Sequence, residues 1–169
     1  QKDELINVER TDGNQQIILA TKNGNAVRFE ERNVRPTGRS AQGVRGISLK
    51  DNDEVIGMVV ASDENTLLTV TENGYGKRTP IAEYRLINRG GSGVINIQCS
   101  ERNGKVVSIC PVTENDDIIF ISKNGIIIRV PATDLSVIGR NTQGVKIMKL
   151  EENDRVVAAV KVPRENNGK

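Results

Sequence analysis

The hydrophobic residues of this chain occur in short runs on either side of three Asn-Gly dipeptides, Asn23-Gly24, Asn73-Gly74 and Asn124-Gly125. The runs are rich in β-branched residues, as in 16–21 (QIILAT) before the first dipeptide and 26–29 (AVRF) after it. Because both central residues of a type I′ turn need a positive φ angle, Asn-Gly between two such runs predicts a tight β-hairpin. The hairpins recur at a spacing of 50 and then 51 residues, so they are copies of one repeat.

Two further strands are expected in each repeat. A glycine loop follows each hairpin and leads into a third apolar segment, at 44–49, 94–98 and 145–150. A fourth segment comes after an acidic turn, at 54–61, 105–112 and 155–162, and a copy of it opens the chain at 4–9. Four strands per repeat predict a blade, and hairpins at this period are typical of a propeller-like array.

The expected fold is therefore all-β, an array of four-stranded blades built from about three repeats of 50–51 residues. We place the repeats at about 4–53, 54–104 and 105–154, with an extra strand at 155–162, all within one part-domain of residues 1–163. Helices no longer than a turn or two are expected at 80–84 and 131–135, and 164–169 is predicted to be a flexible tail. Three blades and a spare strand leave both ends of the array without a neighbour. We therefore expect either a homodimer through the terminal blades or an open arc capped by 4–9.

Composition excludes several classes of protein. No run approaches the roughly 18 apolar residues that a membrane helix requires, so no membrane association is expected. The first residues lack a secretory signal pattern, so we expect a cytoplasmic location. The chain contains no histidine, which excludes Ser-His-Asp triads, His-ligated zinc and histidine acid–base chemistry. The two glycines of 74–79 have one residue between them, whereas a Walker A loop has four residues between its glycines. We predict no catalytic site, no metal site and no cofactor in this chain, and we expect Cys99 and Cys110 to be buried small hydrophobic residues.

The basic residues are concentrated in one part of each repeat. The stretches 22–50, 73–98 and 123–149 hold 16 of the 24 Lys and Arg but only 4 of the 22 Asp and Glu. The repeat register aligns these cations in rows, and rows of guanidinium groups suit a regularly spaced polyanion such as duplex DNA. The candidate phosphate ligands are Arg28, Arg35, Arg39, Arg45, Lys77, Arg78, Arg85, Arg89, Arg129, Arg140 and Lys146.

Glycines beside the rows would let backbone amides approach phosphates closely. These are Gly38, Gly43, Gly90, Gly91, Gly93, Gly139 and Gly144. The alternative is that the arginines are ordinary solvated surface residues and the glycines serve the turns.

Aromatic residues decide which nucleic acid fits. With two Phe, two Tyr and no Trp, the chain has no stacking platform of the kind that single-strand and RNA binders use. Phe29 and Phe120 lie on predicted hairpin strands and are expected in the core. Double-stranded DNA held by its backbone, without base readout, is the partner that we predict.

Several motifs resemble the C-terminal domain of the DNA gyrase A subunit, a six-bladed β-pinwheel. They are Asn73-Gly-Tyr-Gly-Lys-Arg-Thr79, Glu101-Arg-Asn-Gly104 and Val137-Ile-Gly-Arg-Asn-Thr-Gln-Gly-Val145, with Gly43-Val-Arg-Gly-Ile47 in the repeat before. The resemblance covers essentially the whole chain and matches the last three blades of that domain. The family's wrapping motif, Gln-Arg-Arg-Gly-Gly-Lys-Gly, has only a partial counterpart here, Ile87-Asn-Arg-Gly-Gly-Ser-Gly93.

The resemblance implies a non-catalytic, DNA-binding and DNA-wrapping part of a type IIA topoisomerase. In that family the active-site tyrosine lies in a separate N-terminal domain, and ATP and Mg²⁺ are used outside this domain, the ATP on the gyrase B subunit. The implied partners are double-stranded DNA, the rest of gyrase A and gyrase B, in the cytoplasm at the nucleoid. Two alternatives stay open: the corresponding C-terminal domain of topoisomerase IV, which handles DNA crossings, and a propeller that binds an acidic protein.

Overall fold

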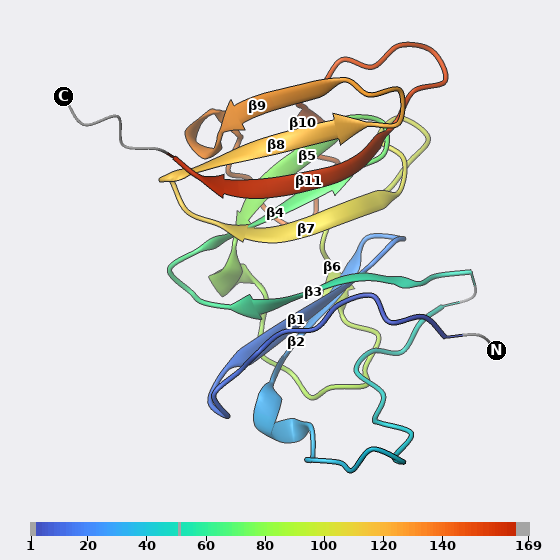
Figure 1. Ribbon diagram of the computed structural model, residues 1–169, viewed down its shortest axis with the longest axis vertical. Helices are drawn as coiled ribbons and strands as arrows, with labels where there is room; N and C mark the ends of the chain where they lie inside the picture. Colours follow the sequence, from blue (N-terminus) through green and yellow to red (C-terminus); the bar gives the residue numbers. More distant parts are fainter. Residues whose placement is uncertain (1–2, 51, 165–169) are drawn as a thin grey trace.

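The computed structural model describes residues 3–50 and 52–164 and contains three twisted antiparallel sheets stacked in an arc (Figure 1). The first sheet contains β1 (Gln16–Thr21), β2 (Asn25–Glu30), β3 (Val55–Ala61) and β6 (Val94–Ile95). The second contains β4 (Thr66–Thr71), β5 (Tyr75–Pro80), β7 (Val106–Val112) and β10 (Val145–Lys146). The third contains β8 (Asp116–Ser122), β9 (Ile127–Pro131) and β11 (Val156–Pro163). This confirms the all-β, repeated architecture.

All three predicted hairpins form, as the pairs β1–β2, β4–β5 and β8–β9. The glycine of each turn has the positive φ that Asn-Gly supplies, +89° at Gly24, +81° at Gly74 and +88° at Gly125. A single 3-10 turn follows each hairpin, at η1 (Glu31–Asn33), η2 (Ile81–Glu83) and η3 (Ala132–Asp134). The last two fall within the predicted short helices, and none of the described helices has the length and apolar run needed to cross a bilayer.

In the second and third repeats the third strand does not pair with the hairpin of its own repeat, contrary to the prediction. Strand β6 of the second repeat pairs with β2 of the first, with Val94 opposite Ala26 and Ile95 opposite Asn25. Strand β10 of the third repeat pairs in the same way with β5 of the second. The glycine loop therefore carries the chain back to the preceding hairpin, and each complete sheet contains residues of two successive repeats.

The predicted strands at 44–49 and 4–9 are wrong, because neither segment forms a strand in the structure. Residues 44–49 occupy the repeat position of β6 and β10, but among the described residues no earlier hairpin exists to pair with them. Residues 4–9 lie extended and mostly exposed, held by one hydrogen bond from Asn7 Nδ2 to the Met58 carbonyl (2.7 Å). A strand without an edge to join has no ladder of hydrogen bonds to fix it.

Glycine is required where the exchanged strand meets the hairpin. A Cβ at Gly93 would lie 2.3 Å from the Ala26 carbonyl oxygen, and one at Gly24 would lie 2.2 Å from the Ile97 oxygen. Any side chain at either position would push the two backbones apart. The glycines of the repeat thus permit the close pairing that joins one sheet to the next.

The core lies between sheets. One cluster packs Ile18, Ala26 and Val59 of the first sheet against the second repeat, represented by Leu67 and Tyr84. A second cluster fills the space between the second and third sheets and includes Phe120. A third lies on the outer face of the first sheet and includes Phe29, so both phenylalanines are in the core as predicted.

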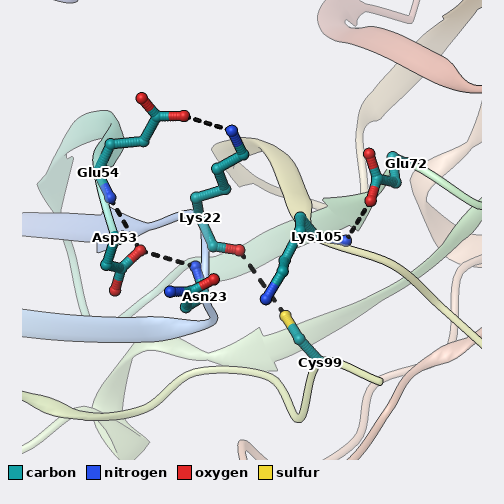
Figure 2. A network of polar contacts seen from close by, with 7 residues as sticks. All are labelled: Lys22, Asn23, Asp53, Glu54, Glu72, Cys99 and Lys105. Carbon is teal, nitrogen blue, oxygen red and sulfur yellow. Dashed lines mark hydrogen bonds and ion pairs between the residues drawn. The ribbon is translucent and has the colours of Figure 1, made fainter. Parts of the chain in front are cut away.

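Acidic turns brace the hairpin turns through a recurrent contact, shown for the first repeat in Figure 2. The Asp53 carboxylate accepts the Asn23 amide (2.9 Å) and its own neighbour's amide at Glu54 (2.9 Å), while Glu54 pairs with Lys22. Asp154 repeats the contact at the third hairpin, where it accepts the Asn124 amide (3.0 Å). At the second hairpin the equivalent residue is Asn103, and its carbonyl accepts the Asn73 amide (3.2 Å); acidic residues therefore serve the first and third hairpin turns.

Three predicted phosphate ligands, Arg28, Arg78 and Lys77, are buried and cannot serve as surface contacts. Arg28 donates to the carbonyls of Ile81 (3.0 Å) and Tyr84 (3.2 Å) in the next repeat, and Arg78 donates to the Leu135 carbonyl (3.1 Å). These arginines join successive sheets by satisfying carbonyls at the 3-10 turns.

Lys77 is completely buried, and its Nζ donates to the carbonyls of Gly139 (2.7 Å) and Arg140 (2.6 Å) and approaches Thr142 Oγ1 (3.1 Å). The prediction that it contacts DNA is wrong. The other repeats place Val27 and Ile128 at the same position, a signal that this site faces inward.

Two smaller predictions also need correction. Arg164, assigned to the flexible tail, donates its amide to the Asn115 carbonyl (3.0 Å) and its Nε to Asp117 (3.0 Å); the remainder of that tail, 165–169, lies outside the described residues. Cys99 and Cys110 are free thiols and only partly buried. Burial raises the pKa of the Cys110 thiol to about 11, so this group is a weak nucleophile at neutral pH.

Replacing Lys77 with methionine should lower the free energy of unfolding by about 2–4 kcal/mol, because three partly buried acceptors lose their donor. Urea denaturation measures the change, with the exposed Lys149→Met as the matched control. A loss within about 0.5 kcal/mol of the control would contradict a structural role for this ammonium.

Stability should also depend on pH through Lys77. Burial lowers the pKa of this ammonium to about 8 from its ordinary 10.5, with Glu83 opposing and Arg140 adding to the shift. Between these pH values the unfolded chain holds a proton that the folded protein has released, so the free energy of unfolding rises with pH. Wild-type stability relative to Lys77→Met should therefore increase from pH 8 to 10.5. An unchanged difference would mean that the pKa is not lowered.

Candidate nucleic-acid interface

A contiguous basic surface is formed by the segments 31–50, 81–98 and 132–149, which follow the three hairpins and which we call the loop surface. These segments hold ten Lys and Arg and three Asp and Glu. None of the ten cations is buried. They are Arg32, Arg35, Arg39, Arg45, Lys50, Arg85, Arg89, Arg140, Lys146 and Lys149.

Hydrogen bonds join each loop to the next. Arg89 donates from Nε to the Asn33 carbonyl (2.7 Å) and from Nη1 to the Arg45 carbonyl (3.0 Å). The Gly90 amide donates to the Gly46 carbonyl (2.6 Å) in the same region. These contacts fix the backbone of the first loop on that of the second.

The third loop is attached to the second in the same way. Arg140 donates from Nε to the Glu83 carbonyl (3.0 Å) and from Nη1 to the Ile95 carbonyl (2.8 Å). The sequence predicts that the row of Arg39, Arg89 and Arg140 supplies equivalent phosphate ligands. In the structure, Arg89 and Arg140 also join neighbouring loops through hydrogen bonds, and their side chains stay partly exposed.

A groove of about 410 Å³ lies where the exchanged strand β6 runs beside the third loop. Two cations line it, Lys50 from the first repeat and Arg140 from the third, together with the polar side chains of Ser92 and Asn141. The groove is open and bears positive charge from two repeats. An anionic group such as a phosphate suits this combination.

Two cations lie over the ring of Tyr75, Lys146 of the loop surface and one that is not among the ten, Arg102. The Arg102 guanidinium carbon lies 5.1 Å from the centre of its ring, and Lys146 Nζ lies 5.7 Å from it. A hydrogen bond from Arg102 lowers the pKa of the Tyr75 phenol. Arg102 is not among the predicted site residues, because it lies outside the three basic stretches of the sequence.

Among the other predicted ligands, three arginines are exposed on the loops and one forms an ion pair elsewhere. Arg35, Arg45 and Arg85 are exposed on the loop surface. Arg129 lies on strand β9 and donates from Nε to Asp117 (2.8 Å), away from the loops. Arg35, Arg45 and Arg85 therefore stay candidate phosphate ligands, and Arg129 does not belong to the same surface.

The loop glycines differ from the prediction that their amides face phosphates. Where strands exchange, a Cβ at Gly93 would lie 2.3 Å from the Ala26 carbonyl oxygen and one at Gly144 would lie 2.8 Å from the Gly76 carbonyl oxygen, so glycine is required at both positions. The carbonyls of Gly91 and Gly139 accept hydrogen bonds from Ser48 and Lys77. Nothing lies within 4 Å of a Cβ placed on Gly38 or Gly43, so space for a phosphate remains beside these two glycines.

Within the part of the chain that the structure describes, no group of three His, Cys, Asp or Glu side chains is arranged to hold a metal ion.

Comparison with known proteins matches the three repeats to one family. A family model described as "DNA gyrase C-terminal domain, beta-propeller" matches residues 15–62, 65–112 and 116–163. Each match begins at a hairpin and ends at the strand that flanks it. The DNA gyrase A subunit of Staphylococcus epidermidis is 47% identical over 167 residues, which is 98% of this chain and 19% of that protein. The chain thus spans about a fifth of the length of the curated relatives that it matches.

Two solved structures share the fold. A DNA gyrase A C-terminal domain superposes with a TM-score of 0.82 at 33% identity, over 88% of this chain and 50% of the other. A C-terminal domain of DNA topoisomerase IV gives a TM-score of 0.86 at 27% identity, over 92% of this chain and 49% of the other. With three repeats matched and nearly half of its residues shared with a gyrase A protein, the chain belongs to the family of DNA gyrase C-terminal domains.

Proposed function

We propose that the loop surface binds the phosphate backbone of double-stranded DNA. The observation that carries the proposal is the set of ten unburied cations on three loops that are hydrogen-bonded to one another. Cations at fixed spacing can displace condensed counterions along a duplex, and this supplies affinity without reading sequence.

The duplex suits this surface better than a single strand does. Tyr84 is buried, Phe29 and Phe120 are in the core, and Tyr75 is largely covered between two cations. Aromatic rings able to stack on bases are thus missing from the described loops. Contacts should be made to phosphates, with little preference among sequences.

Within a larger protein, the chain would act as the DNA-wrapping part of gyrase A. The relatives that support this are gyrase A proteins about five times as long. On this proposal the DNA-cleaving tyrosine and the ATP site lie in other domains, gyrase B is the partner protein, and the cytoplasmic nucleoid is the place of action. The 47% identity to a gyrase A protein favours gyrase over topoisomerase IV, whose solved domain is 27% identical.

DNA binding should fall steeply with salt and vary little among random duplexes. With on the order of 5 phosphate contacts, the plot of log affinity against log salt should have a slope of about −4 to −5. Fluorescence anisotropy with labelled duplexes of several sequences at different salt concentrations measures both properties. A flat salt response, or a preference of about 100-fold for one sequence, would contradict backbone binding. Binding to an acidic protein with no affinity for duplex would favour the alternative function.

Substitution should separate two classes of arginine. Arg85→Ala should reduce the salt slope by about 1 and leave the melting temperature unchanged, because this side chain is exposed. Arg140→Ala should weaken binding and also lower stability by about 0.5–1.5 kcal/mol, because two hydrogen bonds between loops are lost and their exposed carbonyls turn to water. Titration with duplex and thermal unfolding of the same samples test the distinction. If Arg85→Ala binds DNA as wild type does, the loop surface is not the binding site.

A further inference from the structure

The second repeat buries polar side chains where the other two repeats have apolar residues or glycine. Five of its residues are polar at such positions and almost completely buried. They are Thr69, Lys77, Thr79, Tyr84 and Asn96. At the position of Lys77, for example, the other repeats have Val27 and Ile128. Burying polar groups costs free energy unless they are hydrogen-bonded, so the partners of these residues show what they hold in place.

Two of the five donate to the third loop of the loop surface. Lys77 Nζ contacts three oxygens of that loop, two carbonyls at 2.7 and 2.6 Å and the Thr142 hydroxyl at 3.1 Å. Thr79 Oγ1 donates to the Ile138 carbonyl (2.8 Å). Both donors lie on strand β5. The second sheet thus fixes the backbone of residues 138–142.

The three oxygens around Lys77 Nζ match the protonated form of this side chain. An ammonium has three N–H donors and no acceptor. A neutral amine has two donors and a lone pair, so one of the three oxygens would face the lone pair instead of a proton. The observed position of the third loop therefore depends on a charged Lys77.

The segment that Lys77 holds includes Arg140, one of the two cations that line the groove beside β6. The Arg140 guanidinium carbon lies 5.9 Å from the centre of the buried Tyr84 ring, and two of its nitrogens donate to carbonyls of the second repeat. The other cation of the groove, Lys50, comes from the first repeat. A shift of the third loop would move Arg140 relative to Lys50 and change the spacing of charge that a phosphate meets.

The second loop lacks an anchor of this kind. Val27 takes the position of Lys77 in the first repeat, is completely buried, and packs in a cluster with Ile87 of the second loop. A valine side chain has no donor, so the carbonyls of the second loop receive no hydrogen bond from this position. Among the described repeats, the third loop is the one that a buried cation holds.

We propose that Lys77 is a positioning residue for DNA binding, which presents Arg140 to the phosphate backbone by holding the third loop, and does so only while it is protonated. The inference rests on the proposed function of the loop surface. The duplex cannot touch Lys77 itself, because this side chain is completely buried. Its effect on affinity therefore passes through the loop.

Lys77 changes its charge in a range of pH that binding experiments can reach. Burial lowers its pKa to about 8, while Glu83 of η2 opposes this shift and Arg140 of the third loop adds to it. Burial raises the pKa of the neighbouring Tyr84, so that phenol stays neutral over the same range. DNA affinity should therefore fall as the pH rises through about 8, because the form of Lys77 that holds the loop is lost.

Titrations of a labelled random-sequence duplex, followed by fluorescence anisotropy, test the proposal. At about pH 7 and about 0.1 M salt, Lys77→Met should weaken binding by about 5–10-fold and reduce the salt slope by about 1, as the loss of one phosphate contact does. Wild-type affinity should fall by a similar factor between about pH 7 and about pH 9.5. The affinity of Lys77→Met should stay constant over the same range.

Two arginine variants show whether the effect of pH passes through the third loop. Arg140→Ala lacks the side chain that Lys77 positions, so its weaker binding should no longer depend on pH. Arg85→Ala, on the second loop, should bind more weakly than wild type but keep the full dependence on pH. Both positions are unburied, so this comparison does not need Lys77→Met to fold.

Stability separates positioning from folding. Wild-type stability relative to Lys77→Met rises with pH, because the folded protein has the lower pKa, whereas DNA affinity should fall. Opposite directions cannot both come from unfolding. Ile118→Val, which removes a buried methylene from β8 and keeps every contact of Lys77, should lower the melting temperature and leave affinity within about 2-fold of wild type.

Two results would overturn the inference and leave the proposed function in place. One is a wild-type affinity that depends on salt but not on pH. The other is an Arg140→Ala variant that keeps the full dependence on pH. A wild-type chain that does not bind duplex, or binds it without any dependence on salt, would overturn the proposed function and the inference with it.

Discussion

A two-residue strand holds the fold together. After each glycine loop the chain pairs briefly with the hairpin of the preceding repeat, through β6 on β2 and β10 on β5. Such a short ladder stabilises little by itself, but it fixes the register of two repeats and allows the large apolar clusters between sheets to close. Gly93 and Gly144 are needed because the backbones approach so closely. The curvature of the array and the placement of its loops follow from this contact.

The cations of the chain are divided between the interior and the surface as a result. Arg28, Lys77 and Arg78 lie where sheets meet and donate to carbonyls that would otherwise be unsatisfied. Arg89 and Arg140 stand at the boundary, with two nitrogens on carbonyls and the rest of the side chain near solvent. Among the described residues, exposed arginines such as Arg35 and Arg85 make no such hydrogen bonds to carbonyls. Basic residues in this family member therefore both build the loop surface and supply its charge.

Local chemistry allows the sequence to predict some elements well and others poorly. The hairpins follow from Asn-Gly and its β-branched neighbours, and the 3-10 turns follow from Pro80 and Pro131, because each depends on a few adjacent residues. Strand exchange cannot be predicted, because the repeat pattern is the same whether a strand joins its own hairpin or the preceding one. The rows of basic residues are periodic in the sequence, but periodicity does not reveal how deeply each side chain is buried. For Lys77 the apolar residues Val27 and Ile128 in the other copies do indicate an inward position.

We propose that duplex DNA lies along the loop surface that strand exchange assembles. Covalent labelling of lysines with mass-spectrometric readout, with and without a random-sequence duplex, tests it most directly. The account predicts that DNA protects Lys50, Lys146 and Lys149, which lie on the loops, and leaves Lys161 on β11 as reactive as in the free protein. Equal protection of all four, or protection of Lys161 alone, would contradict it.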